Sequence, residues 1–165
     1  MRSEIYWIDE CTEGRLAIMA RPRSGDWLDD EIAGWKAADI GVVVSLLDAG
    51  EVSELGLGRE AEACRSNDIA FVAFPIEDRG VPSSLRQTQE LVEHVVGKLQ
   101  ASEAVAVHCR AGIGRSSLIA ACVLVRLGWD AHHALAAIAR CRGLQVPDTD
   151  EQRHWVTAFA AAPAR

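Results

Sequence analysis

No stretch of this 165-residue sequence is apolar over a length that could cross a membrane. The longest nearly uncharged segment, Ser116–Val125, suits a buried helix instead. A secretory signal peptide is not expected either, because the first ten residues already include Arg2, Glu4, Asp9 and Glu10. These absences predict a cytoplasmic protein without a membrane partner.

Paired cysteines are also lacking. The sequence contains five, an odd number, and none lies at metal-ligand spacing from another: Cys11, Cys64, Cys109, Cys122 and Cys141. A disulfide framework and a metal centre are therefore not expected, and no cofactor is indicated. All but Cys109 are interpreted as small core residues, because free cysteine is often buried. A redox partner that protects Cys109 stays an open alternative, since the sequence nominates none.

Positive charge is in short supply, because 17 Lys and Arg face 24 Asp and Glu, for a net charge of -7. This balance opposes non-specific attraction to nucleic acid, so no nucleic-acid partner is expected. An anionic substrate stays possible in a local positive site. The sequence has no internal repeat and no linker rich in Pro, Gly or Ser, which predicts one domain over residues 1–165. A monomer is the default expectation.

Short β-branched runs alternate with longer helix-like segments, which predicts an α/β layer fold with a largely parallel sheet. Strands are expected at Ile5–Ile8, Leu16–Ala20, Gly41–Leu47, Ala70–Phe74 and Ala104–His108. Helices are expected at Asp26–Ala38, Arg59–Ser66, Ser84–Gln100, Arg115–Leu127, Ala131–Arg142 and Asp150–Ala161. Ser84 and Thr149 begin Ser/Thr-x-x-Gln capping boxes, and Gly128 and Gly143 stand where helices end with glycine.

The most informative segment lies between an apolar strand and an apolar helix. It reads His108, Cys109, Arg110, Ala111, Gly112, Ile113, Gly114, Arg115 and Ser116. Backbone N–H groups of such a loop lack carbonyl partners, and the positive end of the helix dipole lies beneath them, so a tetrahedral phosphate fits there. Gly112 and Gly114 are expected to supply positive φ and close backbone approach.

Residue types at fixed places in this loop predict their roles. Cys109 is the expected nucleophile, because the donors that hold phosphate also stabilise a thiolate. The planar fork of Arg115 suits two equatorial phosphoryl oxygens. Ser116 could donate a hydrogen bond to the departing sulfur, while His108 is expected to hold the loop backbone rather than act as a base. The other loop residues, 110–114, are expected to bind the phosphate.

This segment matches the signature His-Cys-x-x-Gly-x-x-Arg-Ser/Thr, and the chain thereby resembles the protein tyrosine phosphatase superfamily, in particular its compact dual-specificity branch. The resemblance covers roughly residues 40 to 155. It implies a three-layer αβα sandwich with a five-stranded, mostly parallel sheet. It also implies phosphoryl transfer to Cys109 and then to water, without a metal.

The leaving oxygen of a phosphate ester needs a proton donor, and Asp78 is the candidate. It follows a predicted strand within Pro75-Ile76-Glu77-Asp78, with Pro82 shortly after, which resembles the general-acid loop of compact relatives. Asp78 would then serve as base towards the attacking water. Glu77 is the alternative acid. Gln152 resembles the water-positioning glutamine of the family, although a capping role beside Thr149 explains it equally well.

Arg110 is the only basic residue among the variable loop positions, which favours a phosphoprotein or phosphopeptide over an inositide substrate. Phosphotyrosine is the preferred target, with phosphoserine and phosphothreonine also open. Alternatives from other classes are a phosphoinositide or other small-phosphoester phosphatase, a sulfurtransferase or arsenate-reductase-like enzyme, and a non-catalytic phosphate-binding adaptor. The presence of Asp78, His108 and Ser116 argues against the sulfur-transfer class, and an adaptor would not need nucleophile, arginine and acid together.

Overall fold

A five-stranded sheet lies at the centre of the computed structural model, which describes residues 4–163. Its strands are β1 (Ile5–Trp7), β2 (Leu16–Met19), β3 (Ile40–Ser45), β4 (Ala70–Ala73) and β5 (Ala104–His108). They lie in the order β1-β2-β5-β3-β4, and only the β1–β2 pair is antiparallel. The expected mostly parallel, five-stranded sheet is confirmed.

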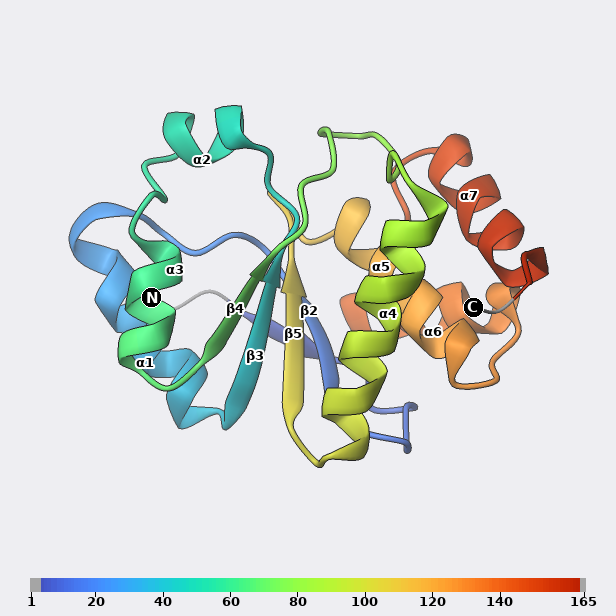
Figure 1. Cartoon of the computed structure of the whole chain (residues 1–165), viewed down its shortest axis with the longest axis horizontal. Coiled ribbons are helices and arrows are strands. Elements are labelled where there is room, and N and C mark those ends of the chain that lie inside the picture. The colour runs from blue at the N-terminus through green and yellow to red at the C-terminus, as the bar shows by residue number, and fades with distance from the viewer. Residues whose placement is uncertain (1–3, 164–165) are drawn as a thin grey trace.

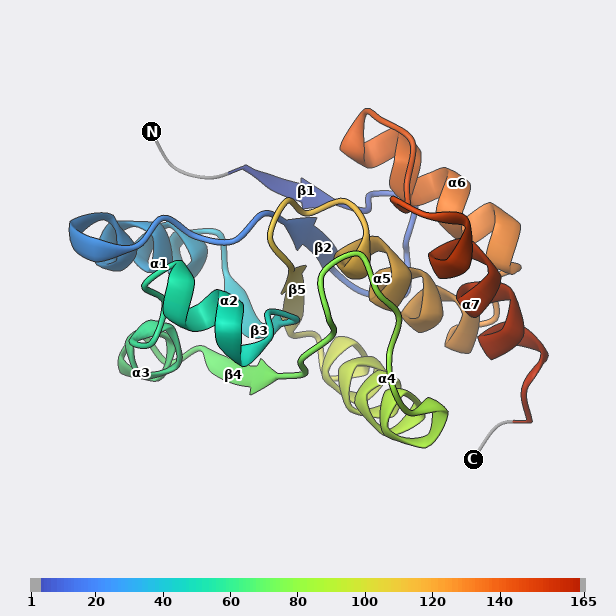
Figure 2. The same cartoon turned by 90° about the horizontal axis from the view of Figure 1, so that it is seen from above.

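Helices cover both faces of the sheet, which completes the expected αβα sandwich (Figures 1 and 2). One face carries α1 (Leu28–Ala37) and α3 (Glu60–Ser66). The other carries α4 (Leu85–Gln100), α5 (Arg115–Arg126), α6 (Ala131–Arg142) and α7 (Asp150–Ala161). The short α2 (Ala49–Glu54) lies beyond the carboxyl end of β3, at the edge where the parallel strands end (Figure 1).

Alternate residues of the central strands face two separate hydrophobic cores, as the strand period of two requires. In β5, Val105 and Val107 belong to the core beneath α4–α7, whereas Ala106 belongs to the core beneath α1 and α3. Because β5 is covered on both faces, all five of its residues are buried. The helix that follows, α5, is also enclosed, with residues 115–124 all buried. The loop between them is therefore anchored on the most buried strand and helix.

Every strand and helix expected from the sequence is present, with ends that differ by a few residues. One helix was missed. The segment 49–54 forms α2, which begins with a complete capping box between Asp48 and Glu51. The helix is too short to show a helical hydrophobic period, and it contains Gly50, so the sequence pattern did not predict it. The expected helix at Asp26 also begins differently, because Gly25–Trp27 forms a 3-10 turn ahead of α1.

The expected end signals are mostly confirmed. Thr149 and Gln152 form a complete capping box at α7, while at α4 only the half in which Ser84 Oγ accepts from the Gln87 amide is present. Gly128 and Gly143 follow their helices with positive φ. Among the described helices, none has the length and apolar character needed to cross a bilayer.

The cysteines are free, and those outside the loop are buried or half-buried, as expected. Burial raises the pKa of the Cys64 thiol to about 12 and that of Cys141 to about 11. Burial likewise raises the pKa of Cys11 and of Cys122. These thiols therefore stay protonated near neutrality and are poor nucleophiles.

Candidate active site

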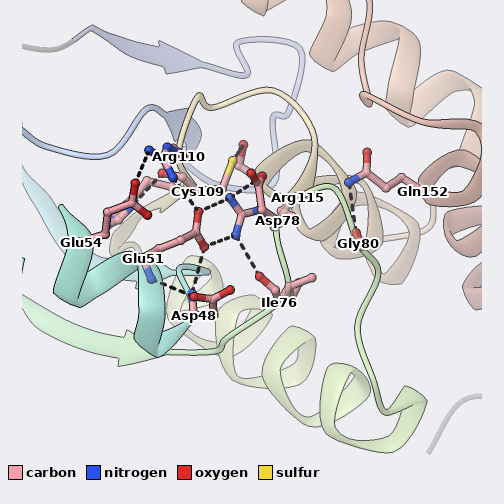
Figure 3. A network of polar contacts seen from close by, with 12 residues as sticks. Asp48, Glu51, Glu54, Ile76, Asp78, Gly80, Cys109, Arg110, Arg115 and Gln152 are labelled. Atoms are coloured by element: carbon pink, nitrogen blue, oxygen red, sulfur yellow. Dashed lines mark hydrogen bonds and ion pairs between the residues drawn. The ribbon is translucent and has the colours of Figure 1, made fainter.

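The predicted phosphate loop connects β5 to α5 at the carboxyl edge of the sheet (Figure 3). Cys109 is the first residue after β5 and Arg115 the first of α5, and each is 2% exposed. The Cys109 sulfur lies 3.3 Å from Ser116 Oγ, within hydrogen-bond distance. The structure thus brings the predicted nucleophile, arginine and serine together at the floor of one loop.

Each of four successive carbonyls in this loop has a donor outside the loop that holds it. The donor–acceptor pairs are His108 Nδ1 with Cys109 O (3.1 Å), Arg21 N with Arg110 O (3.2 Å), Arg142 Nη2 with Ala111 O (3.4 Å) and Arg142 Nε with Gly112 O (3.0 Å). In a trans peptide unit the N–H points opposite to the C=O. The only cis bond among residues 4–163 is Val146–Pro147, so the loop amides at 110–113 are directed to the inner side.

An inward ring of amides at the start of a buried helix is an anion site, because the N–H dipoles and the helix dipole point at the same space. The guanidinium of Arg142 is held in turn by the Tyr6 ring, whose centroid lies 4.2 Å from its Cζ. Arg142 was not expected at the site. Arg142 reaches the loop carbonyls because the end of α6 lies on the outer side of the loop, and no local sequence pattern predicts that position.

The two loop glycines have different roles. Gly112 has a φ of +71°, and a Cβ there would lie 2.6 Å from the backbone of Met19, so both its conformation and its space require glycine. Gly114 has an ordinary φ of -84°, which corrects the expectation of positive φ. Space there is restricted by side chains alone, since a Cβ would lie 2.5 Å from Oδ2 of the exposed Asp148 and 3.0 Å from the amide of the buried Gln152. Asp148 was another residue that the sequence did not nominate.

Arg115 is held in a bidentate ion pair with Glu51 of α2 (Figure 3). Its Nη1 lies 2.6 Å from Glu51 Oε1 and its Nη2 lies 2.9 Å from Glu51 Oε2. Nη1 also donates to the Ile76 carbonyl at 2.9 Å, and Nη2 to Asp78 Oδ1 at 3.0 Å. The Nε–Nη2 edge of the guanidinium becomes available for an oxyanion once Asp78 moves away, because Glu51 occupies the Nη1–Nη2 edge and takes only one of the two Nη2 protons.

Glu51 itself is buried, and its carboxylate also closes the α2 capping box by accepting from the Asp48 amide at 3.1 Å. Burial raises the pKa of Glu51, but the hydrogen bonds from Arg115 and Asp48 and the nearby positive charge outweigh it, so that its pKa lies below the ordinary value. The Asp-x-x-Glu spacing directly after a predicted strand was the signal that could have located Glu51.

Asp78 lies on the segment that follows β4 and reaches over the loop to Arg115 (Figure 3). The segment is anchored before Asp78 by the Ile76 amide, which donates to the Leu46 carbonyl at 3.0 Å, and turns after it through Gly80 N to Glu77 O at 2.8 Å. The Asp78 side chain is 53% exposed. Of the two candidate acids, Asp78 is the one in contact with Arg115.

Gln152 is fully buried, and both ends of its amide have partners. Oε1 accepts from the Thr149 amide at 3.2 Å, and Nε2 donates to the Gly80 carbonyl at 3.0 Å. Gln152 therefore joins α7 to the segment that carries Asp78 (Figure 3). Its expected place beside a reacting water stays a prediction.

The remaining predicted residues lie around the loop. Arg110 is 40% exposed on its side chain and pairs with Glu54 at 3.4 Å, with Glu51 4.0 Å away. His108 is fully buried behind Cys109 and lies 2.6 Å from Glu60. Within residues 4–163, no group of three His, Cys, Asp or Glu side chains is arranged to hold a metal ion.

A family model described as "Polymorphic toxin system, DSP-PTPase phosphatase" matches residues 17–129, which include the whole phosphate loop and Asp78. The chain belongs to this DSP-PTPase phosphatase family. The resemblance seen in the loop signature is thereby confirmed, including its dual-specificity branch. Among known proteins, the chain is similar to cyclin-dependent kinase inhibitor 3 of Rattus norvegicus, with 26% identity over 126 residues. That match covers 75% of this chain and 59% of the rat protein.

Solved structures agree on the fold of this chain. Kinase-associated phosphatase, in a form whose catalytic cysteine is replaced by serine, superposes with a TM-score of 0.86 and 21% identity, covering 98% of this chain and 96% of that one. PTPMT1 superposes with a TM-score of 0.78 and 19% identity, covering 96% of this chain and 94% of that one. PTPMT1 has also been solved in complex with PI(5)P.

Replacement of Arg142 tests whether this side chain holds the carbonyls of Ala111 and Gly112 on the outer side of the loop. In Arg142→Ala, two carbonyls lose their donor, so we expect the affinity for inorganic phosphate to fall about tenfold, the equivalent of one charge-assisted hydrogen bond of about 1.5 kcal/mol. Calorimetry would measure this affinity. Arg140→Ala is the matched control, since Arg140 lies on the same helix but pairs with Glu10. Equal affinities in both variants would contradict the role.

Glu51 makes stability depend on pH. Because its folded pKa lies below the unfolded value of about 4.3, its ion pair stabilises the fold above that pH, and the contribution is lost as the pH falls through the folded pKa. We expect Glu51→Gln to be less stable by about 3 kcal/mol at pH 7 and to lose less on acidification below about pH 4.3. Urea unfolding at pH 3 to 7 measures both, and parallel pH profiles would count against this assignment.

Proposed function

We propose that this chain is a metal-independent, cysteine-dependent phosphatase that hydrolyses phosphomonoesters, with protein phosphotyrosine as its main target. The observation that carries the proposal is the inward ring of loop amides that directly follows Cys109, with Arg115 at its end. Such a ring stabilises both a thiolate and the equatorial oxygens of a phosphoryl group. Membership of the DSP-PTPase phosphatase family supports the same reaction class.

The first step transfers the phosphoryl group to sulfur. The Cys109 thiolate attacks phosphorus, the S–P bond forms, and the P–O bond to the leaving oxygen breaks. Arg115 binds two equatorial oxygens through its free Nε–Nη2 edge. Asp78, released from that edge and protonated from solvent, gives its proton to the leaving oxygen. The products are the free alcohol or phenol and a cysteinyl phosphate.

The second step returns the enzyme to its starting state. Asp78, now a carboxylate, takes a proton from water as the water oxygen attacks phosphorus, and the S–P bond breaks. The sulfur leaves as a thiolate, which Ser116 Oγ stabilises by a hydrogen bond from 3.3 Å. Inorganic phosphate is released, with no change in oxidation state.

Two observations support a phosphoprotein substrate over a phosphoinositide. The only basic side chain among the variable loop residues, Arg110, is paired with Glu54 and is near Glu51, so its charge is already balanced. A headgroup that carries several phosphates would need further cations there. The 2% exposure of Cys109 fits a long aryl phosphate such as phosphotyrosine better than a short alkyl one.

A phosphoinositide or other small phosphoester is the second candidate, because the structural neighbour PTPMT1 was solved with PI(5)P. Comparing rates on phosphotyrosine, phosphoserine and phosphothreonine peptides with rates on phosphoinositides would separate the candidates. A preference for the inositides by kcat/KM would overturn the substrate assignment and leave the reaction class intact.

The nucleophile is tested by Cys109→Ser. We expect wild-type protein to hydrolyse p-nitrophenyl phosphate in EDTA and the variant to lose at least about 10⁴-fold in kcat, because a serine hydroxyl is not ionised at neutral pH. Cys122→Ser, a buried cysteine of α5 away from the loop, is the matched control. Undiminished turnover by Cys109→Ser would refute the mechanism.

The acid is tested by Asp78→Asn. Because a poor leaving group depends most on proton donation, we expect kcat to fall about 10²- to 10⁴-fold with an alkyl phosphate and much less with p-nitrophenyl phosphate. Glu77→Gln serves as the control on the neighbouring carboxylate. The assignment fails if the two variants lose the same rate with the alkyl substrate.

A further inference from the structure

A buried carboxylate lies directly behind the phosphate loop. Glu60, in the first turn of α3, is 2% exposed, and its Oε2 lies 2.6 Å from Nε2 of the fully buried His108. The other ring nitrogen of His108, Nδ1, lies 3.1 Å from the Cys109 carbonyl oxygen. Trp35 packs on the same imidazole at 6.2 Å between ring centroids. The ring therefore has one polar partner on each side and no water-facing side.

These partners determine where protons reside. A backbone carbonyl only accepts hydrogen bonds, so Nδ1 must carry a proton to contact Cys109 O. One further proton lies between Nε2 and the Glu60 carboxyl, in a hydrogen bond as short as charge-assisted ones. Whichever of these two atoms holds that proton, the tautomer with a proton on Nδ1 is kept. Without Glu60, Nε2 would be buried with no partner, and nothing would hold that side of the ring while Nδ1–H donates to the carbonyl.

We propose that Glu60 is a positioning residue for the reaction at Cys109, acting through His108. By binding Nε2 on the far side of the ring, it keeps Nδ1–H donating to the Cys109 carbonyl, which stays directed outward, and the Arg110 amide of the same peptide unit therefore points at the bound phosphoryl group. The loop and the fold's opposite layer are coupled in this way, since Glu60 stands on α3 and Cys109 follows β5. The inference rests on the proposed function for its catalytic effect, though not for the tautomer.

The test compares Glu60→Leu, which removes the partner, with Glu60→Gln, whose amide can donate to Nε2 and so preserve the proton on Nδ1. We expect Glu60→Leu to lose about tenfold or more in kcat/KM, as residues that orient a reacting group through a histidine do. Glu60→Gln should restore most of that rate. Glu31→Gln is the matched control, because Glu31 is an equally buried glutamate on α1 that pairs with Arg23.

Nitrogen NMR of the His108 ring gives a readout that packing alone would not change. We expect an Nδ1–H that is protected from exchange with solvent in wild type and in Glu60→Gln near pH 7, and a loss of that protection in Glu60→Leu. A bare Nδ1 in the wild-type protein would overturn the proposal, even if Glu60→Leu did not fold. So would a folded Glu60→Leu with wild-type kcat/KM, or one that is impaired while its Nδ1–H stays as protected from exchange as in wild type. Absence of turnover by the wild type would instead refute the proposed function and leave the ring measurement valid.

Discussion

The outward fixation of four consecutive carbonyls is the constraint on which the rest of the site depends. Amides cannot be turned toward a ligand individually; they follow when the carbonyl of the preceding residue is held on the far side. Here the holding groups come from separate parts of the chain: His108 at the end of β5, Arg21 after β2 and Arg142 at the end of α6. The sandwich architecture is what brings them around one loop. The inward ring of loop amides is therefore a property of the whole fold, although its sequence signature is short.

The positive charges of the site are also held by groups outside the loop. Each arginine is paired with a glutamate on the side away from the ligand, and the side that faces the ligand stays open. Arg115 would be costly to bury alone, and Glu51 compensates it along one edge of the guanidinium while the other edge stays directed to the ligand space. Arg110 is balanced by Glu54 at the rim. A protein with a net charge of -7 thus keeps a local site for a dianion without a broad positive surface.

The sequence predicted the fold class and every strand. The central strands β2, β3 and β5 are strongly apolar runs buried on both faces, which have few alternative readings. It also predicted the loop residues, which are contiguous. It did not predict Glu51, Glu60 or Arg142, which meet their partners across 64, 48 and 30 positions of chain. Such contacts depend on strand order and helix placement, which local patterns do not encode. Positive φ at Gly114 was wrong because this residue is the N-cap of α5 and its backbone is already in the right-handed region.

The contact between Asp78 and Arg115 makes the free protein its own weak competitor. A carboxylate tethered to the chain is present at high effective concentration, so a solvent anion must displace it to reach the guanidinium. Chloride or acetate accepts few hydrogen bonds from the loop amides and therefore competes poorly with Asp78. A phosphoryl group accepts hydrogen bonds from the whole ring of amides when it displaces Asp78. The same displacement that admits the substrate sets the aspartate free beside it. The ion pair between Arg115 and Asp78 thus affects both which anions bind and when Asp78 becomes free to exchange protons.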